Sequence, residues 1–245
     1  MTLTTLVTKS LRSNAKVSCS SCSLRELCLP LGLDEQAVKA LDHLISQRHK
    51  IRRDEHLHHE GLVFHSLHVV RAGFFKTYIL HEDGREQITG FYMPGEVLGL
   101  DAISTDTHTC NSVALEDSEV CELPFVQLER VGCAIPTLMH HFHKIMSFEI
   151  VRDRRMLLGS MKAGERLIVF LLNLSRRFAM RGYSPLEFNL RMTREEIGSY
   201  LGLKLETISR AFSKLQAEGL ITVNNKQIRL NDIEHLRRKY GNSPY

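Results

Sequence analysis

The residues from Thr193 to Leu230 constrain the fold more than any other part of the chain. In "MTREEIGSYLG", Glu196 follows Thr193 by three residues, which is the capping-box spacing of a helix start. Gly202 interrupts the helical pattern, and "LETISRAFSKLQAEG" predicts a second helix that ends at Gly219. "LITVNNKQIRL" then predicts two short strands around Asn-Asn. Helix, short turn, helix and hairpin is the order of a winged helix-turn-helix.

Upstream of this unit, the spacing of apolar residues divides the chain further. From about His49 to Arg130, short apolar runs alternate with turns such as "HEDGRE", so we expect a small β-roll. After Pro136, apolar residues recur at steps of three and four and predict one long helix. The predicted fold class is therefore α+β. The expected divisions are a flexible tail at 1–18, a cysteine loop and β-roll at 19–135, a dimerisation helix at 136–163 and a winged helix-turn-helix at 164–245.

One acidic residue interrupts the apolar stripe of the predicted long helix. The stripe consists of Met139, Phe142, Met146, Ile150 and Leu157, and Asp153 lies within it. A long helix with such a stripe often pairs with its own copy, so we expect a homodimer; packing on its own β-domain is the alternative. In a symmetric pair the two Asp153 carboxylates lose solvation together, so Asp153 and Ile150 are expected to form a dimer switch. The alternative places Asp153 at the surface, paired with Arg154 or Arg155.

Charge is unevenly distributed along the chain. From Gly164 to the C-terminus, 14 Lys and Arg residues oppose 8 Asp and Glu residues, whereas the whole chain carries a formal net charge of only +4. A basic C-terminal third favours a polyanion partner such as DNA or RNA, although a solvated basic face gives the same excess.

The second helix of the predicted helix-turn-helix is expected to enter the major groove of double-stranded DNA. Glu206, Ser209 and Arg210 are spaced at i, i+3 and i+4, so they share one face. Arg can pair with guanine, Glu can accept from cytosine, and Ser can donate or accept. A charged helix face usually meets only solvent, but the position of this one behind a helix-turn-helix favours base recognition. The expected phosphate contacts are Thr207, Lys214, Lys226 and Arg229.

Composition excludes several classes of protein. No run of eighteen apolar residues exists, so we expect no membrane span. The first residues lack the apolar core of a signal peptide, which places the chain in the reducing cytoplasm, where clustered cysteines favour metal ligation over disulfides. No G-x-G-x-x-G motif and no nucleophile–base set is present, so we expect no enzymatic activity.

Three of the six cysteines form the pattern C-x2-C-x5-C at Cys19, Cys22 and Cys28. Both tetrahedral zinc and an iron–sulfur cubane take four ligands, so a fourth cysteine is required. Cys121, in "VCELPF", is the candidate, on a predicted strand at the edge of the β-roll. Thiolates suit both zinc and iron–sulfur clusters, so ligand type alone leaves the metal open.

The remaining cysteines and the histidine clusters are given structural roles. Cys110 and Cys133 are expected to be small buried hydrophobic residues. The histidines of "HLHHE" and "HHFHK" are expected to lie at the surface or on a helix face, without a metal. Leu24, Leu27 and Leu29 are expected to shield the cysteine site from solvent.

The motif "MTREEIGSYLGLKLETISRAFSKLQAEGLI" resembles the helix-turn-helix of the Crp-Fnr superfamily of transcription regulators, and the resemblance extends from Cys19 onward. The cysteine pattern, with "LCLP" behind it and the distant "VCELPF", resembles the FNR branch. That resemblance implies an oxygen-labile 4Fe–4S cluster on Cys19, Cys22, Cys28 and Cys121, and a homodimer that reads TTGAT-type inverted half-sites through Glu206, Ser209 and Arg210.

The same resemblance implies further roles. Asp153 matches an acidic residue that limits dimerisation of the cluster-free protein, and the loop "HEDGREQ" around Gly84 matches a contact with RNA polymerase. Lys204 departs from the family, whose members commonly carry a capping Thr there; the loss is about 1 kcal/mol at most.

Cyclic nucleotides are the alternative ligand within this superfamily. Such a site needs an Arg to hold the phosphate, but the corresponding segment reads "TDTHTCNSVAL" and contains no Arg. The chain therefore favours redox sensing, with a cyclic-nucleotide- or zinc-dependent regulator of the same fold as the alternative.

Overall fold

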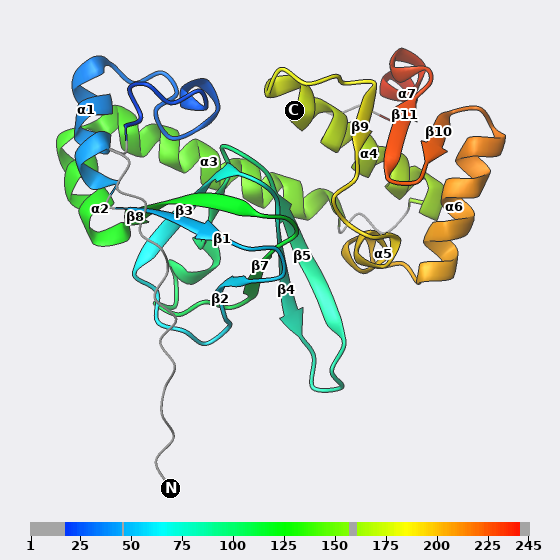
Figure 1. Ribbon diagram of the computed structural model, residues 1–245, viewed down its shortest axis with the longest axis horizontal. Coiled ribbons are helices and arrows are strands. Elements are labelled where there is room, and N and C mark those ends of the chain that lie inside the picture. Colours follow the sequence, from blue (N-terminus) through cyan, green and yellow to red (C-terminus); the bar gives the residue numbers. More distant parts are fainter. Residues whose placement is uncertain (1–17, 46, 157–160, 241–245) are drawn as a thin grey trace, which may run out of the picture. The chain divides into compact units, whose positions relative to one another are not determined.

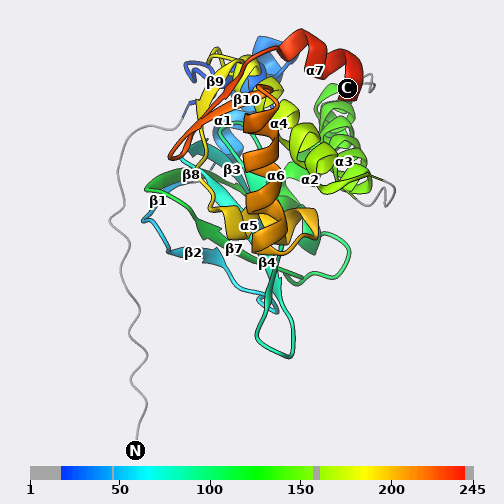
Figure 2. The ribbon, with the colours of Figure 1, turned by 90° about the vertical axis from the view of Figure 1, so that its right-hand side faces the viewer.

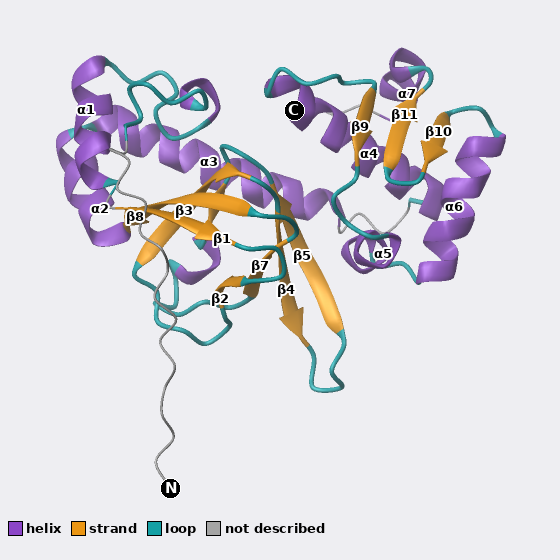
Figure 3. Cartoon of the chain, viewed as in Figure 1, coloured by secondary structure: helices purple, strands orange, loops and turns teal. Residues whose placement is uncertain are grey.

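The structure is a computed structural model that describes residues 18–45, 47–156 and 161–240, and for 152–156 only the backbone. Strands dominate its first half and helices its second half (Figure 3). The first half contains η1 (Arg25–Leu27), α1 (Glu35–Leu44), β1 (Gln47–Ile51), β2 (His56–His58), β3 (Ser66–Ala72), β4 (Phe75–Leu80), β5 (Glu86–Tyr92), β6 (Val97–Leu98), η2 (Leu100–Ala102), β7 (Asn111–Ala114), β8 (Ser118–Pro124) and α2 (Phe125–Ala134). The second half contains α3 (Pro136–Met156), α4 (Ala163–Met180), β9 (Glu187–Asn189), α5 (Arg194–Leu201), α6 (Leu205–Ala217), β10 (Ile221–Asn224), β11 (Gln227–Leu230) and α7 (Ile233–Tyr240).

Contacts divide the chain into two compact units. The first comprises residues 1–75 and 92–141, and the second comprises residues 76–91 and 142–245. Within the described residues, no helix has the length and apolar character that a membrane span requires.

The first unit is built around an antiparallel sheet in the order β1-β8-β3-β6. β8 lies in the middle, and its Cys121 pairs with Arg48 on one side and Val69 on the other. β2 pairs with β7 through a register shift between His56 and His58. A core of buried side chains holds the roll together: Ile51, Val70, Phe75, Leu98, Ala114 and Val120. The expected β-roll is thereby confirmed.

α1 packs through one apolar face and lies beside α2 in the first unit (Figure 1). The Asp34 side chain caps the helix by accepting a hydrogen bond of 2.8 Å from the Ala37 amide. Four residues at helical spacing are buried: Ala37, Val38, Leu41 and Leu44. Because this face fixes the rotation of α1, Asp42 lies on the polar side of the helix, where its carboxylate accepts from the Cys19 amide.

The second unit contains the helix-turn-helix, which α5 and α6 form (Figure 2). The predicted capping box is present, since the Glu196 amide donates to the Thr193 hydroxyl at 3.1 Å and the Thr193 amide donates to the Glu196 carboxylate at 2.7 Å. Gly202 ends α5 in the left-handed region, with φ of 65°. β9 joins the β10–β11 hairpin as a third strand, in the order β10-β11-β9.

The predicted hairpin "HEDGRE" is also present, between β4 and β5. Gly84 has a φ of +80° at its tip, and a Cβ there would meet no atom within 4 Å. Ser199 of α5 binds the base of the hairpin, because its hydroxyl donates to the Glu86 carbonyl at 3.0 Å and accepts from the Ile88 amide at 2.9 Å.

Several sequence predictions are wrong in detail. β8 does not lie at the sheet edge, because β1 pairs with its outer side. Residues 125–130 belong to α2 rather than to the strand region. Cys133, predicted to be buried, is exposed, because it lies on the outer face of α2. His58, predicted to lie at the surface, is 5% exposed because the side chain turns into the roll, whereas His140 and His143 are exposed as predicted.

Candidate metal centre and nucleic-acid interface

The three N-terminal cysteines lie on a loop made of successive tight turns. The Cys22 amide donates to the Cys19 carbonyl at 3.1 Å, and the Arg25 amide donates to the Cys22 carbonyl at 3.1 Å. The chain then passes through η1, and the Leu31 amide donates to the Cys28 carbonyl at 2.9 Å. Because each turn satisfies backbone groups locally, the loop presents three thiols without belonging to a sheet or a long helix.

Cys121 of β8 joins these three cysteines in one pocket. The pocket is lined by Cys19, Cys22, Leu24, Arg25, Cys28, Leu29, Pro30, Leu41, Ile45, Val69, Val70, Arg71, Cys121 and Leu123. The structure therefore brings together the four cysteines that the sequence singled out, although Cys121 follows Cys28 by ninety-three residues. Two of the three expected shielding leucines, Leu24 and Leu29, line the pocket, whereas Leu27 does not.

Asp42 of α1 holds the start of the cysteine loop. Its carboxylate accepts a short hydrogen bond from the Cys19 amide, one of 2.5 Å from the Ser20 hydroxyl and one of 3.4 Å from the Ser18 hydroxyl. Partial burial opposes ionisation, but the bonds from Ser20 and Cys19 outweigh it and hold the Asp42 pKa below its usual value. Sequence reasoning missed this residue because no local motif connects it to the cysteines.

Three thiols of this pocket, those of Cys19, Cys28 and Cys121, have raised pKa values and are held in their protonated form. Burial, reinforced by the negative charge of Asp42 and then by Cys121 and Cys22, raises the Cys19 pKa to about 12. Burial is also the main reason why the pKa values of Cys28 and Cys121 are raised, and Arg48 offsets part of the effect at Cys121. A bound metal would displace these protons, because the thiolate is the ligand.

The spacing of the thiols bears on which metal centre they fit. Among the described residues, no three of the pocket sulfurs lie within 4.8 Å of one another. A tetrahedral zinc site, with Zn–S bonds of about 2.3 Å, holds its sulfurs about 3.8 Å apart. A cluster that gives each thiolate its own iron atom requires a wider arrangement. The described sulfurs are thus spaced more widely than the ligands of a bound zinc ion, and four thiolates are also the donor set of a four-iron cluster.

Cys110 and Cys133 stand apart from this pocket. Neither lines it, and Cys110 is buried elsewhere in the roll, as predicted. Cys133 is the exposed cysteine of α2, which makes it a matched control for substitutions in the pocket.

The turn between α5 and α6 sets the orientation of the second helix. The Leu203 amide donates to the Gly198 carbonyl at 2.8 Å, and a Cβ on Gly198 would lie 2.8 Å from the Leu203 carbonyl oxygen. Glycine is therefore required where the two segments approach each other. The inner face of α6 is buried through Ile208, Ala211, Phe212 and Leu215.

The outer face of α6 carries the predicted base-reading residues. Glu206, Thr207 and Arg210 are exposed, and Ser209 is half-buried. No ion pair joins Glu206 or Arg210 to another side chain in the part of the chain that the structure describes. Lys204 is the N-cap residue of α6 and its side chain makes no capping hydrogen bond, as expected for the departure from Thr. Lys214, Lys226 and Arg229 are exposed on the same unit.

The expected dimer residues lie on α3. Ile150 is 53% exposed, although Phe142, two turns earlier on the same stripe, is 2% exposed. The backbone of Asp153 belongs to α3, but its side chain lies outside the described residues.

Comparisons with known proteins cover the roll and the helix-turn-helix. A model of the Crp-like helix-turn-helix domain matches residues 165–239, and a model of the cyclic nucleotide-binding domain matches residues 48–132. The chain is 44% identical over 225 residues to the transcriptional regulatory protein btr of Bordetella pertussis, covering 91% of this chain and 93% of that protein. It is 41% identical over 229 residues to the fumarate and nitrate reduction regulatory protein of Escherichia coli K12, covering 93% and 92%. Among solved structures, FixK2 from Bradyrhizobium japonicum matches with a TM-score of 0.71 and 30% identity, covering 78% of this chain and 96% of that one.

Proposed function

Because the chain belongs to the Crp-Fnr family of transcription regulators, we propose that it is an oxygen-sensing activator and repressor of anaerobic metabolism in the cytoplasm. The observation that carries this proposal is the convergence of four thiols from two distant segments on one apolar pocket. The proposed ligands of an oxygen-labile 4Fe–4S cluster are Cys19, Cys22, Cys28 and Cys121.

The residues of the pocket suit the binding of such a cluster. When bound, the cluster supplies a centre that reacts with oxygen. The leucines at the pocket wall limit the access of water and oxygen to the thiols, and the Asp42 carboxylate holds the loop at its first ligand. Arg71 and Arg48, close to Cys121, supply positive charge that favours thiolates.

A cyclic nucleotide is poorly supported as the ligand. The match to the cyclic nucleotide-binding domain reflects the shared roll, but the segment from Thr105 to Leu115 contains no Arg and no Lys. The phosphate of a cyclic nucleotide would have no cation from this segment.

We assign sequence-specific recognition of DNA to α6. The exposed Arg210 and Glu206 suit base contacts in TTGAT-type inverted half-sites, with Ser209 and Thr207 beside them. Reading two inverted half-sites requires a homodimer, for which the exposed Ile150 on α3 supplies apolar surface. Asp153 is the proposed acidic limit on that dimer, and the exposed hairpin tip at Gly84 is the proposed contact with RNA polymerase.

Purification without oxygen tests the proposal. We expect coloured protein with about four irons and four sulfides per chain, which bleaches in air and then loses its affinity for an inverted-repeat duplex. Cys121→Ser should abolish the colour, whereas Cys133→Ser, which removes an exposed cysteine, should retain it. Colourless protein with stoichiometric zinc would refute the cluster and would favour a zinc-dependent regulator.

The DNA-reading role has its own test under the same anaerobic conditions. Arg210→Ala should weaken binding to the inverted repeat by about 1–3 kcal/mol and relax the base preference at one position. Lys214→Ala should instead weaken binding to all sequences and reduce the salt dependence by about one counterion. Equal losses of specificity from both variants would contradict the assignment of Arg210.

A further inference from the structure

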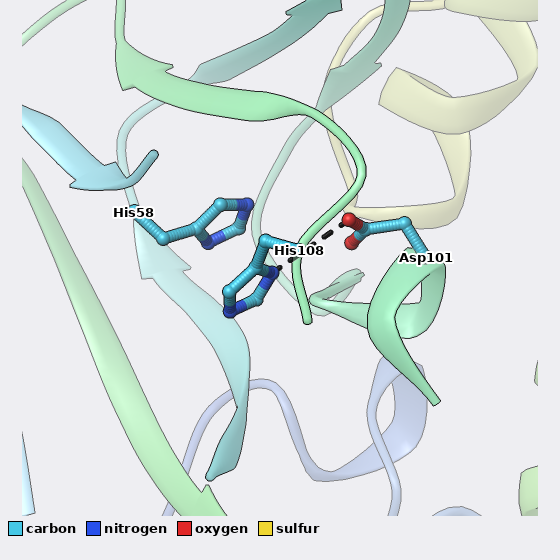
Figure 4. Close-up of side chains that lie close together, drawn as sticks. All are labelled: His58, Asp101 and His108. Atoms are coloured by element: carbon cyan, nitrogen blue, oxygen red, sulfur yellow. Dashed lines mark ion pairs between the residues drawn. The ribbon is translucent and has the colours of Figure 1, made fainter. Parts of the chain in front are cut away.

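Two histidines and an aspartate meet inside the roll, away from the cysteine pocket. His58 ends β2, Asp101 lies on η2, and His108 lies in the loop before β7 (Figure 4). One ligand atom from each of these residues lies within 4.8 Å of the other two. None of the three lines the cysteine pocket.

Hydrogen bonds hold the backbone around this cluster in place. The Gly61 amide donates to the His108 carbonyl at 2.8 Å, and the His108 amide donates to the Leu62 carbonyl at 2.9 Å. The Thr109 amide donates to the Asp101 carboxylate at 2.8 Å. The three side chains are therefore supplied by segments whose relative positions within the roll are fixed by hydrogen bonds.

Three of the ring nitrogens of His58 and His108 have no hydrogen-bond partner among the described residues. His58 and His108 are each 5% exposed, and their rings stack at 3.7 Å with an interplanar angle of 10°. Neither ring nitrogen of His58 has a hydrogen-bond partner among the described residues. Nδ1 of His108 lies 3.6 Å from the Asp101 carboxylate, which is too long for a hydrogen bond. Buried polar atoms without a partner are rare and call for an explanation, such as a bound ion.

We propose that His58, Asp101 and His108 form a binding site for a borderline divalent cation such as Zn²⁺. Two imidazoles and one carboxylate are a donor set that such ions take, with a fourth position left for water. The unpartnered ring nitrogens would become ligands, and the carboxylate supplies negative charge against the cation.

Metal binding requires only a local adjustment of these side chains. Bonds of about 2.0–2.2 Å from zinc to nitrogen and oxygen place the ligand atoms of a tetrahedral site about 3.4 Å apart. The ligand atoms, which lie within 4.8 Å of one another, therefore have to move closer together. Rotation of one of the stacked rings about its χ angles brings its nitrogen toward the carboxylate. Cys110 is a buried thiol within hydrogen-bonding reach of the Asp101 carboxylate.

The position of this cluster gives it a structural consequence. It joins β2, η2 and the loop before β7. A cation bound there would cross-link the three segments and stabilise the roll.

Calorimetry with Zn²⁺ tests the site in a full-length chain whose pocket thiols are removed. The background variant carries Ser in place of Cys19, Cys22, Cys28 and Cys121, so that the cysteine pocket takes no zinc. We expect one Zn²⁺ per chain. His108→Gln and Asp101→Asn should each weaken zinc binding by at least about tenfold, since the loss of a ligand should cost no less than the loss of an outer partner. His65→Gln, which alters an exposed histidine, should leave binding unchanged.

A second measurement keeps the inference falsifiable if the background variant fails to fold. In the chain with intact cysteines, His108→Gln should lower the total zinc bound by one equivalent, and zinc should raise the melting temperature of the parent chain more than that of the variant. Absence of zinc binding in the folded background variant, or zinc binding that Asp101→Asn and His108→Gln leave unchanged, would overturn the proposal. Because the background variant lacks the pocket thiols, a failure here leaves the iron–sulfur proposal unaffected.

Discussion

Substitution of Asp42 separates the two ways in which its carboxylate acts on the cysteine loop. The carboxylate accepts hydrogen bonds from the Cys19 amide and from two serine hydroxyls, which orders the loop. It also places a negative charge beside Cys19. This charge is the second cause, after burial, of the raised pKa of that thiol. The first effect favours a bound metal centre and the second opposes it.

Two variants distinguish these effects. Asp42→Ala removes both the acceptor and the charge, whereas Asp42→Asn removes the charge and keeps an oxygen that accepts from the Cys19 amide. A hydrogen bond to a charged acceptor contributes about 1.5–3 kcal/mol. At about 1.4 kcal/mol for each factor of ten, Asp42→Ala should weaken retention of the metal centre about 10- to 100-fold. Asp42→Asn should retain it as well as the parent chain, because the lower Cys19 pKa compensates for the weaker bond.

The assay is anaerobic reconstitution, followed by measurement of iron retained against a chelator. Glu35→Ala is the matched control, because Glu35 is an exposed acidic residue on the same helix and its loss removes one negative charge without a bond to the loop. If Asp42→Ala retains iron as firmly as the parent chain, the carboxylate does not anchor the site. If Asp42→Asn retains iron as poorly as Asp42→Ala, a neutral hydrogen-bond acceptor does not hold the site, and the negative charge of Asp42 is what stabilises it.

Three further predictions concern stability, measured by urea unfolding of the chelator-treated chain. Burial lowers the His68 pKa from 6.5 to about 4, so the unfolded chain takes up this proton at a higher pH than the folded chain, and stability falls as the pH drops. Between pH 7.5 and 5.5 this histidine contributes a loss of about 1.3 kcal/mol, and His68→Gln should remove that contribution. Gly198→Ala should destabilise by about 1–3 kcal/mol because its Cβ would lie 2.8 Å from a backbone oxygen, whereas Gly164→Ala, whose Cβ would lie 4.0 Å from the nearest atom, should be neutral or stabilising. Lys204→Thr should stabilise by about 0.5–1 kcal/mol by supplying the missing cap of α6, and a loss instead would contradict that geometry.

The helix-turn-helix was predictable because its signals are local. The capping box of Thr193 and Glu196, the left-handed glycine at 202 and the apolar spacing of α6 all act within a few residues, and the structure contains each of them. The family resemblance read from that motif is confirmed by the match over residues 165–239 and by relatives that cover most of the chain.

Features that depend on pairing between distant segments were predicted less well. The strand at Cys121 was expected, but its place between β1 and β3 was not. The alternation of apolar and polar residues along a strand carries no information about the order of strands in a sheet. Cys133 and His58 were assigned to the wrong environments for a related reason. Burial depends on which face of an element meets the rest of the fold, and α2 was absent from the predicted elements.

Asp42 marks the limit of such predictions. The helix that carries it had a readable signal, since Asp34 is an N-cap and Val38, Leu41 and Leu44 recur at helical spacing. That pattern fixes Asp42 on the polar side of α1 but cannot say what the polar side faces. The partner is the Cys19 amide, twenty-three residues earlier, and the contact exists because the buried face of α1 sets the rotation of the helix. The cysteine motif thus singles out the proposed ligands, whereas packing of an apolar face elsewhere positions the carboxylate that holds their loop.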